Sequence, residues 1–179
     1  GLTTAQIDVL GSDEIGAITP SDIAALSALQ LKAFDTVQLN ALTSSQQGFL
    51  SAAAIAALGT SEVLALSSVS SRIGSLTPKQ IANLTTSQLS LGALTSAQVG
   101  GLTSDQGANL RTQQIAALTS INIKGLDTSV VAVLGTQQLR ALTPDNIRGL
   151  TAKQLAVVGT ENIFAIQDVD LQALNSVQV

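Results

Sequence analysis

The sequence contains no cysteine, histidine, methionine, tryptophan or tyrosine. Thiolates and imidazoles are the usual ligands of soft metals, the usual redox groups and the usual acid–base groups near neutral pH. Without these side chains, the most familiar catalytic and metal-binding sites have no residues to use. We therefore expect no enzyme activity, no catalytic residue, no bound metal and no other cofactor.

Charged residues are also scarce. They make up 11% of the chain, and the net charge is -4. A basic patch that could bind nucleic acid or anionic lipid is therefore absent, and we expect no nucleic-acid partner. Thr, Ser or Gln interrupts every apolar run well before the roughly 18 residues that a membrane span requires, so we also expect no membrane span. Because the chain begins with Gly1 and shows no signal-peptide pattern, we expect a processed or excised piece.

What the sequence does contain is a repeat of eight residues. An aliphatic residue or Phe recurs at every eighth position from Leu2 to Leu66. Two ten-residue units, 67–76 and 85–94, then each add two residues before the spacing of eight resumes. The consensus unit begins with Thr or Ser, has Gln, Glu, Asp or Asn at its fourth position and Ile, Leu or Val at its fifth, and ends on Leu. The pattern predicts a single repeat array over residues 1–179.

Each octapeptide has the features of a short helix. Thr followed three residues later by Gln, Glu or Asp is a capping box, which marks the start of a helix. Pro20, Pro78 and Pro144 directly follow the capping Thr, at the first helical position, where the missing N–H costs nothing. The apolar pair, such as Ile23 and Leu26, is spaced i,i+3 and faces one side of the helix. We therefore predict one helix per octapeptide.

A longer period, of three octapeptides, runs through the array. The octapeptides fall into three classes that alternate along the chain. Gly replaces the capping residue in only one of these classes, and that class always has Ala at its seventh position. This recurrence predicts an all-α solenoid with three short capped helices per superhelical turn. Ala117 is then expected at a contact between helices, and Ala116 on the outer face. A three-sided β-solenoid is the alternative, although its strands would favour β-branched residues in alternation.

The octapeptides LTTAQIDV from Leu2, LTSAQVGG from Leu94 and LRTQQIAA from Leu110 carry a likeness to known proteins. They resemble the Leu-Thr-x-x-Gln-Ile-x-Ala octapeptide arrays of large bacterial surface proteins that are described as adhesins or haemagglutinins. Similar octapeptides also resemble variable outer regions of some flagellins. The resemblance implies an extracellular spacer or fibre and supplies no catalytic residue. It implies no haem either, because His, Met, Cys and Tyr, the usual axial ligands, are missing.

Three further patterns were considered as functional features. Thr recurs along one edge of the predicted solenoid at Thr19, Thr43, Thr95, Thr119 and Thr143, but helix capping already accounts for these hydroxyls. Asn83 and Asn109 occupy equivalent positions and could stack as an inward amide ladder. The pairs Asp13–Glu14 and Asp168 with Asp170 lack the spacing of a calcium loop, and solvated helix starts explain them better.

The irregular units offer the best candidate for a binding site. Insertions in repeat proteins often map to the binding face, and both ten-residue units lie close together in the array. We therefore predict that a partner docks, if anywhere, on a bulge formed by Ser70, Ser71, Arg72 and Leu91.

The expected function follows from the architecture. Neither end of the sequence has the polar capping repeat of a solenoid that ends in water. The chain either continues into flanking repeats or associates with itself, head to tail or laterally. We expect a structural region of a bacterial cell-surface or extracellular protein that acts as an adhesin stalk or fibre. A polymerising filament or flagellin-like subunit is the second interpretation, and a peptide- or glycan-binding module is the third.

Overall fold

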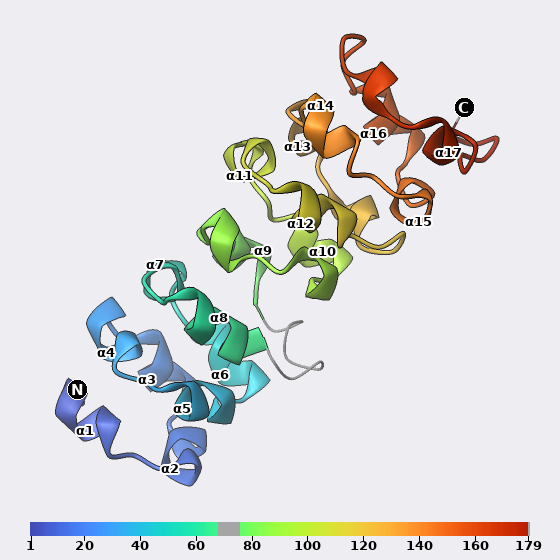
Figure 1. Cartoon of the computed structure of the whole chain (residues 1–179). Coiled ribbons are helices and arrows are strands. Elements are labelled where there is room, and N and C mark those ends of the chain that lie inside the picture. Colours follow the sequence, from blue (N-terminus) through green and yellow to red (C-terminus); the bar gives the residue numbers. More distant parts are fainter. Residues whose placement is uncertain (68–75, 179) are drawn as a thin grey trace. The chain divides into compact units, whose positions relative to one another are not determined.

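The computed structural model describes residues 1–67 and 76–178, and every regular element in these ranges is a short α-helix or 3₁₀-helix (Figure 1). No strand occurs in the ranges described. The prediction of an all-α solenoid is therefore confirmed, and the β-solenoid alternative does not apply to these residues.

The helices form two compact units, which are described separately. The first unit is Gly1–Gln88. Its elements are α1 (Thr4–Asp8), α2 (Ser12–Ala17), α3 (Pro20–Ala24), α4 (Ala28–Lys32), α5 (Thr36–Ala41), α6 (Ser44–Phe49), α7 (Ala52–Ala56), α8 (Thr60–Ser67), α9 (Pro78–Ile81) and η2 (Thr86–Gln88).

The second unit is Leu89–Val179. Its elements are η3 (Leu91–Ala93), α10 (Ser96–Val99), α11 (Ser104–Ala108), α12 (Thr112–Ala116), η4 (Ile123–Gly125), α13 (Thr128–Ala132), α14 (Thr136–Leu139), α15 (Pro144–Ile147), α16 (Ala152–Ala156), η5 (Ile163–Ala165) and α17 (Asp168–Leu171). That residues 1–179 form one continuous array stays a prediction.

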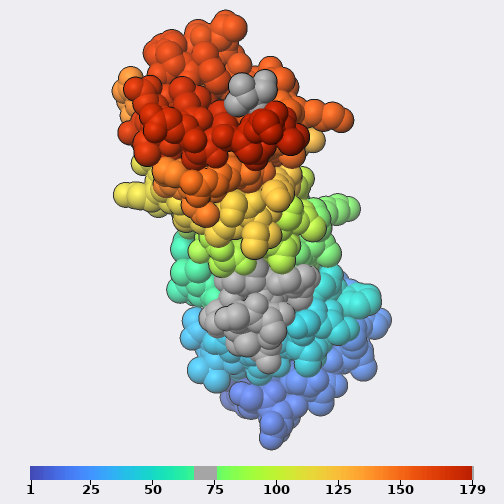
Figure 2. Space-filling model, turned by 90° about the vertical axis from the view of Figure 1, so that its right-hand side faces the viewer, coloured from blue at the N-terminus to red at the C-terminus, as the bar shows by residue number. Residues whose placement is uncertain are grey.

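Within each unit, a helix packs against the helix three octapeptides further along the chain. In the first unit α2 packs on α5, and α5 packs on α8. In the second unit α11 packs on α13, and α13 packs on α16. The colours in Figure 2 accordingly follow one another in bands within each unit. The predicted turn of three octapeptides, each with its own helix, is thereby present in both units.

Local hydrogen bonds explain why each helix is short. The N-cap residue is extended, as at Thr43 (φ -69°, ψ 160°), and its hydroxyl accepts a hydrogen bond from the N–H of Gln46 at 3.2 Å. At the other end the N–H of the eighth residue, Leu50, donates to the carbonyl of Gln47, the fifth residue, at 3.2 Å. Leu50 is then itself extended and leads into the next cap. Helices of this length are unstable alone, so packing must hold them.

The core consists of the apolar pair of each octapeptide. Ile115 is fully buried and Leu118 is 3% exposed. The fifth residue is fully buried in most described octapeptides, and the eighth is buried in most of those away from the ends of the sequence. Because the chain has only 3 Phe and no other aromatic residue, aliphatic side chains supply almost all of this burial.

The closest approaches between stacked helices involve glycine. Ala117 lies at such a contact, as predicted, through its backbone: a Cβ atom on Gly92 of η3 would lie 2.8 Å from the Ala117 carbonyl oxygen. The side chain of Ala117 is exposed, as is that of Ala116. The tightest contacts are made by Gly at the seventh position of another class of octapeptide. A Cβ atom on Gly125 would overlap the carbonyl oxygen of Ser96, and one on Gly149 would lie 2.6 Å from Ser120 Cα. Backbone packs directly on backbone at these positions.

Replacing these glycines tests the close approach. Gly125→Ala should lower the free energy of unfolding by about 1–3 kcal/mol or more, because the added methyl group must push η4 away from α10. Gly16→Ala is the matched control, because Gly16 lies inside α2, where an added Cβ would have no atom within 4 Å. It should stabilise by about 0.5–1 kcal/mol. Chemical denaturation of both variants measures these changes, and equal effects would contradict the packing.

Candidate functional site: an amide ladder between turns

The fourth residue of most octapeptides is Gln or Asn, and its side chain first completes the cap of its own helix. Gln46 Oε1 accepts a hydrogen bond from the N–H of Thr43 at 2.7 Å, and Gln154 Oε1 accepts from the N–H of Thr151 at 2.7 Å. The capping box predicted from the sequence is therefore confirmed in these helices. It uses only the oxygen of the amide.

The nitrogen of the same amide reaches the preceding turn. Gln154 Nε2 donates to the carbonyl oxygens of Ile123 at 3.1 Å and Leu126 at 2.7 Å. These carbonyls belong to the fifth and eighth residues of an earlier octapeptide, 31 and 28 positions back along the chain. The amide of Gln154 therefore joins the start of α16 to the octapeptide just before α13, the helix on which α16 packs. We call this recurring contact the amide ladder.

The amide ladder recurs through both units. Donation to both carbonyls, at separations of 31 and 28 residues and at distances of 2.7–3.1 Å, is made by Gln38, Gln46, Asn122, Gln138, Gln154 and Gln178. Most of these side chains are buried, and Gln154 is only 3% exposed. Inside the core, a neutral amide satisfies the cap N–H and both carbonyls without bringing in a charge.

The ladder also shows how the first ten-residue unit affects the register. Gln80 Nε2 donates to the carbonyls of Gln47 at 3.1 Å and Leu50 at 2.6 Å. These separations are 33 and 30 residues, two longer than elsewhere, because the unit 67–76 adds two residues. The contact pattern resumes on the far side of that unit.

Four interior octapeptides depart from the amide at the fourth position. Ala54 and Val130 are buried apolar residues there, and Glu62 is half-buried. Asp170 is 1% exposed, and neither of its carboxyl oxygens has a hydrogen-bond partner among the described residues. Burial raises the pKa of Asp170, against the smaller opposing effect of the nearby Gln167 backbone.

The column of Thr hydroxyls serves helix capping, as predicted. The hydroxyls of Thr19 and Thr43 in the first unit, and of Thr95, Thr119 and Thr143 in the second, each accept a hydrogen bond from the N–H of the fourth residue, at 3.2–3.3 Å. The ladder predicted for Asn83 and Asn109 is wrong. Each of these amides is exposed and donates to a carbonyl of its own helix four residues back, at 2.9 Å and 2.8 Å.

The predicted docking bulge is only partly covered by the structure. Ser70, Ser71 and Arg72 lie outside the described residues. Leu91 begins η3 and is 1% exposed, so its side chain packs in the core of the second unit and offers no surface to a partner. Docking at the remaining three residues stays a prediction.

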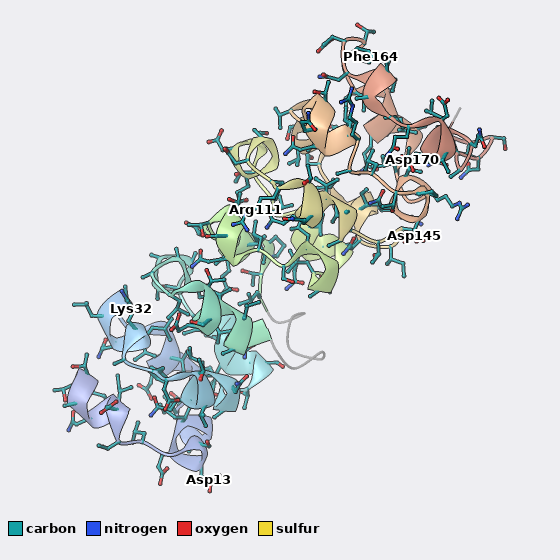
Figure 3. The ribbon with its side chains drawn as sticks, in the orientation of Figure 1. Asp13, Lys32, Arg111, Asp145, Phe164 and Asp170 are labelled. Atoms are coloured by element: carbon teal, nitrogen blue, oxygen red, sulfur yellow. The ribbon has the colours of Figure 1, made fainter. Side chains whose placement is uncertain are left out.

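Neither a metal centre nor a membrane span emerges from the residues described. Over residues 1–67 and 76–178, no three Asp or Glu side chains are grouped so that they could hold a metal ion. In the same ranges, none of the helices has both the length and the apolar character to cross a membrane. Figure 3 shows the labelled charged side chains, including Asp13, Lys32 and Asp145, at separate places along the chain.

The sequence analysis missed the donor half of the ladder. A capping box accepts Glu or Gln at its last position, so the Gln that recurs there looked like a cap partner and nothing more. The available signal was the strong preference for Gln and Asn over Glu. Unlike an ionised Glu or Asp, which only accepts, a Gln or Asn amide donates as well as accepts, and a recurring amide therefore indicates a second contact.

The stacking and the amide ladder define a helical repeat protein. A family model described as the ALTTAQ repeat matches residues 15–51 and 131–167, one segment in each compact unit. The words of that description include LTTAQ, which occurs at residues 2–6. No curated protein matches the chain. The matches support a structural repeat region.

The ladder can be tested by removing its donor alone. Gln154→Glu keeps an oxygen for the Thr151 N–H, but it replaces the buried Nε2 with a carboxylate oxygen that faces two carbonyls. We expect a loss of about 2–4 kcal/mol in the free energy of unfolding at pH 7. Thermal and chemical denaturation followed by circular dichroism measure this loss.

Gln6→Glu is the matched control. Gln6 has the same capping contact with Thr3 but is exposed. A glutamate in the first turn of a helix is favourable, so this variant should keep or slightly raise the stability. Equal losses in the two variants would show that capping alone explains the recurring Gln.

Proposed function

We propose that this chain is a passive spacer: a stretch of helical array that holds other parts of a bacterial cell-surface protein apart, as the stalk or fibre of an adhesin does. No catalytic residue is assigned, and the proposed setting is extracellular. The proposed partners are flanking repeats of a longer chain or further copies of the same array.

The main support is where the recurring chemistry lies. In a repeat protein that binds a repetitive ligand, a recurring residue should face the solvent. Here the recurring polar residue is the fourth of the octapeptide, and its side chain makes hydrogen bonds between turns, as at Gln46 and Gln154. The third residue is exposed in every described octapeptide, yet it ranges from Leu29 to Asp145 and Lys153. Recurrence therefore maintains the architecture and leaves the outer surface free to vary.

A second support is that each turn repeats the contacts of the previous turn. The ladder joins α5 to the octapeptide before α2 in the same way as it joins α16 to the octapeptide before α13. Nearest-neighbour stacking of this kind lets an array gain or lose whole turns without changing the other contacts. That property suits a part whose useful feature is its length. The extracellular setting rests on the resemblance of the octapeptides to those of bacterial surface proteins.

Surface location is tested on the bacterium that produces the protein. Antibodies raised against the purified chain should label intact cells or material shed from them. Labelling that appears only after the cells are lysed would overturn the extracellular setting. A cytoplasmic protein of the same organism, probed in parallel, reports whether the cells are intact.

Electron microscopy of the purified chain separates a spacer from a polymerising subunit. A spacer should give particles of constant size over a wide range of protein concentrations. Particles that lengthen as the concentration rises would favour the filament, because open ends that stack head to tail form a contact that does not close. Sedimentation velocity over the same concentrations provides an independent size measurement.

Deleting one turn tests whether the array is modular. Removal of residues 103–126 takes out three whole octapeptides, so the remaining octapeptides keep their places in the turn, and the melting temperature should change by no more than about 5 °C.

Removal of residues 103–110 alone is the matched out-of-register variant. It shifts every later octapeptide by one place, so that Val133 takes the position of Gly125 against Ser96. A Cβ atom at this position would overlap the Ser96 carbonyl oxygen. This shorter deletion should melt at a distinctly lower temperature. If the deletion of three octapeptides unfolded the protein instead, length could not be the selected property.

A further inference from the structure

Asp170 is the most unusual polar residue in the described chain. It lies in α17, which packs on α15 in the second unit (Figure 3). The side chain is 1% exposed, and both carboxyl oxygens lack a hydrogen-bond partner among the described residues. A buried carboxylate without a partner is strongly unfavourable, and such a group normally takes up a proton or acquires a contact.

The equivalent residues in the two preceding turns show what that contact is. Asn122, Asn146 and Asp170 follow one another at intervals of three octapeptides and hold the same place in the octapeptide. Asn122 Oδ1 accepts from the Thr119 N–H at 2.8 Å, while Nδ2 donates to the carbonyls of Leu91 and Leu94 at 2.9 Å and 3.1 Å.

Asn146 makes the same kind of contact one turn later. Its Nδ2 donates to the Ile115 carbonyl at 3.2 Å, and its Oδ1 accepts from the Thr143 N–H at 2.9 Å. A side chain of this length is therefore sufficient for the amide ladder. Aspartate has the same length and shape as asparagine, and the two differ only in the group at one terminal atom.

The register of the repeat indicates which carbonyls Asp170 should face. Asn122 donates to carbonyls that lie 31 and 28 residues before it, and the same offsets from Asp170 lead to Leu139 and Leu142. An ionised carboxylate can only accept hydrogen bonds, so it would oppose the carbonyls of these residues. A protonated carboxyl group has one O–H and can donate as the asparagine amide does.

We propose that Asp170 is a proton-operated latch: when protonated it donates its O–H to the carbonyl of Leu139 or Leu142 and holds α17 against α15, and when ionised it releases α17. The proton comes from solvent and returns to it, and no other group takes part. The array would therefore hold this turn more tightly when Asp170 is protonated than when it is ionised.

The charged groups around α17 do not provide an alternative partner. Asp168 lies on the same helix, Asp145 lies on α15, and Arg148 directly follows it. Arg140 follows α14, and its carbonyl oxygen accepts a hydrogen bond from Gln167 Nε2 at 3.0 Å. All four side chains are exposed, whereas the carboxyl group of Asp170 is buried. Solvent screens their charges, and burial dominates the behaviour of Asp170.

The direction of the pH effect follows from proton linkage. Burial raises the pKa of Asp170 above its ordinary value of 3.8, so the folded protein binds more protons than the unfolded chain at pH values between the two. Stability should therefore fall as the pH rises from 3.8 through the folded pKa, and the loss should be complete above it.

The test compares the wild-type chain with Asp170→Asn, which places a permanent donor at the latch. At pH 7.5 the variant should melt about 3–10 °C above the wild type, and this difference should shrink as the pH is lowered through the folded pKa of Asp170 towards 3.8. Asp168→Asn is the matched control, because it removes the same charge from an exposed site on the same helix. It should retain the pH dependence of the wild type.

Two local measurements report on the latch itself. The carboxyl carbon resonance of Asp170 in the intact chain should titrate with a midpoint above 3.8. The amide protons of Leu171 and Gln172, which donate within and next to α17, should have protection factors that are higher near pH 3.8, where Asp170 is protonated, than at pH 7.5. In Asp170→Asn the protection should be independent of pH.

Three results would overturn the proposal. The first is a midpoint at or below 3.8, and the second is a difference in melting temperature between wild type and Asp170→Asn that stays constant with pH. The third is a loss of pH dependence in Asp168→Asn as large as that in Asp170→Asn. None of these depends on whether the array is a spacer, so the latch and the proposed function succeed or fail separately.

Discussion

The structure depends on one side-chain amide that makes two kinds of contact. A helix of one or two turns leaves most of its N–H and C=O groups without a partner inside the helix, and it is unstable alone. In each ladder octapeptide the amide oxygen satisfies the cap N–H of its own helix, while the nitrogen satisfies the end of an octapeptide one turn earlier, as Gln138 does for Gly107 and Leu110. In these octapeptides the same side chain completes the helix cap and stacks the turn.

The same constraint explains why the chain carries so little charge. The fourth position is buried between turns, where an ionised group would cost several kcal/mol unless it were paired. Glutamate and aspartate occupy that position where solvent reaches it, as at Glu14 and Asp22 in the first turn, while amides occupy it inside. Since the interactions that join the turns are between neutral groups, salt should affect the stability of the array only weakly. Asp170 is the exception that makes one turn sensitive to pH.

The parts of the fold that obey local rules were predictable from the sequence. Capping boxes, Pro at the first helical position and the i,i+3 apolar pair act within one octapeptide, and the period of three octapeptides appears as recurrence. The contacts between turns were harder to predict, because they depend on which backbone atoms approach. Ala117 recurs regularly, yet its side chain is exposed, whereas a Cβ atom on Gly125 would overlap the backbone of the preceding turn. Gln154 looked like a cap partner because its carbonyl acceptors lie 28 and 31 residues away.

A residue that recurs in a repeat protein can either bind a ligand or contact the next repeat. Whether the recurring residue lies on the surface or between repeats distinguishes the two roles. In this chain the recurring groups are the fifth and eighth residues of the core, the cap hydroxyl and the amide, and all of them act within or between turns. The exposed third position carries apolar, acidic and basic residues, such as Ile121, Asp13 and Lys79. A ligand that followed the repeat along its length would meet different chemistry at each octapeptide. What every unit preserves is the ability to add another turn, which is the property that a spacer requires.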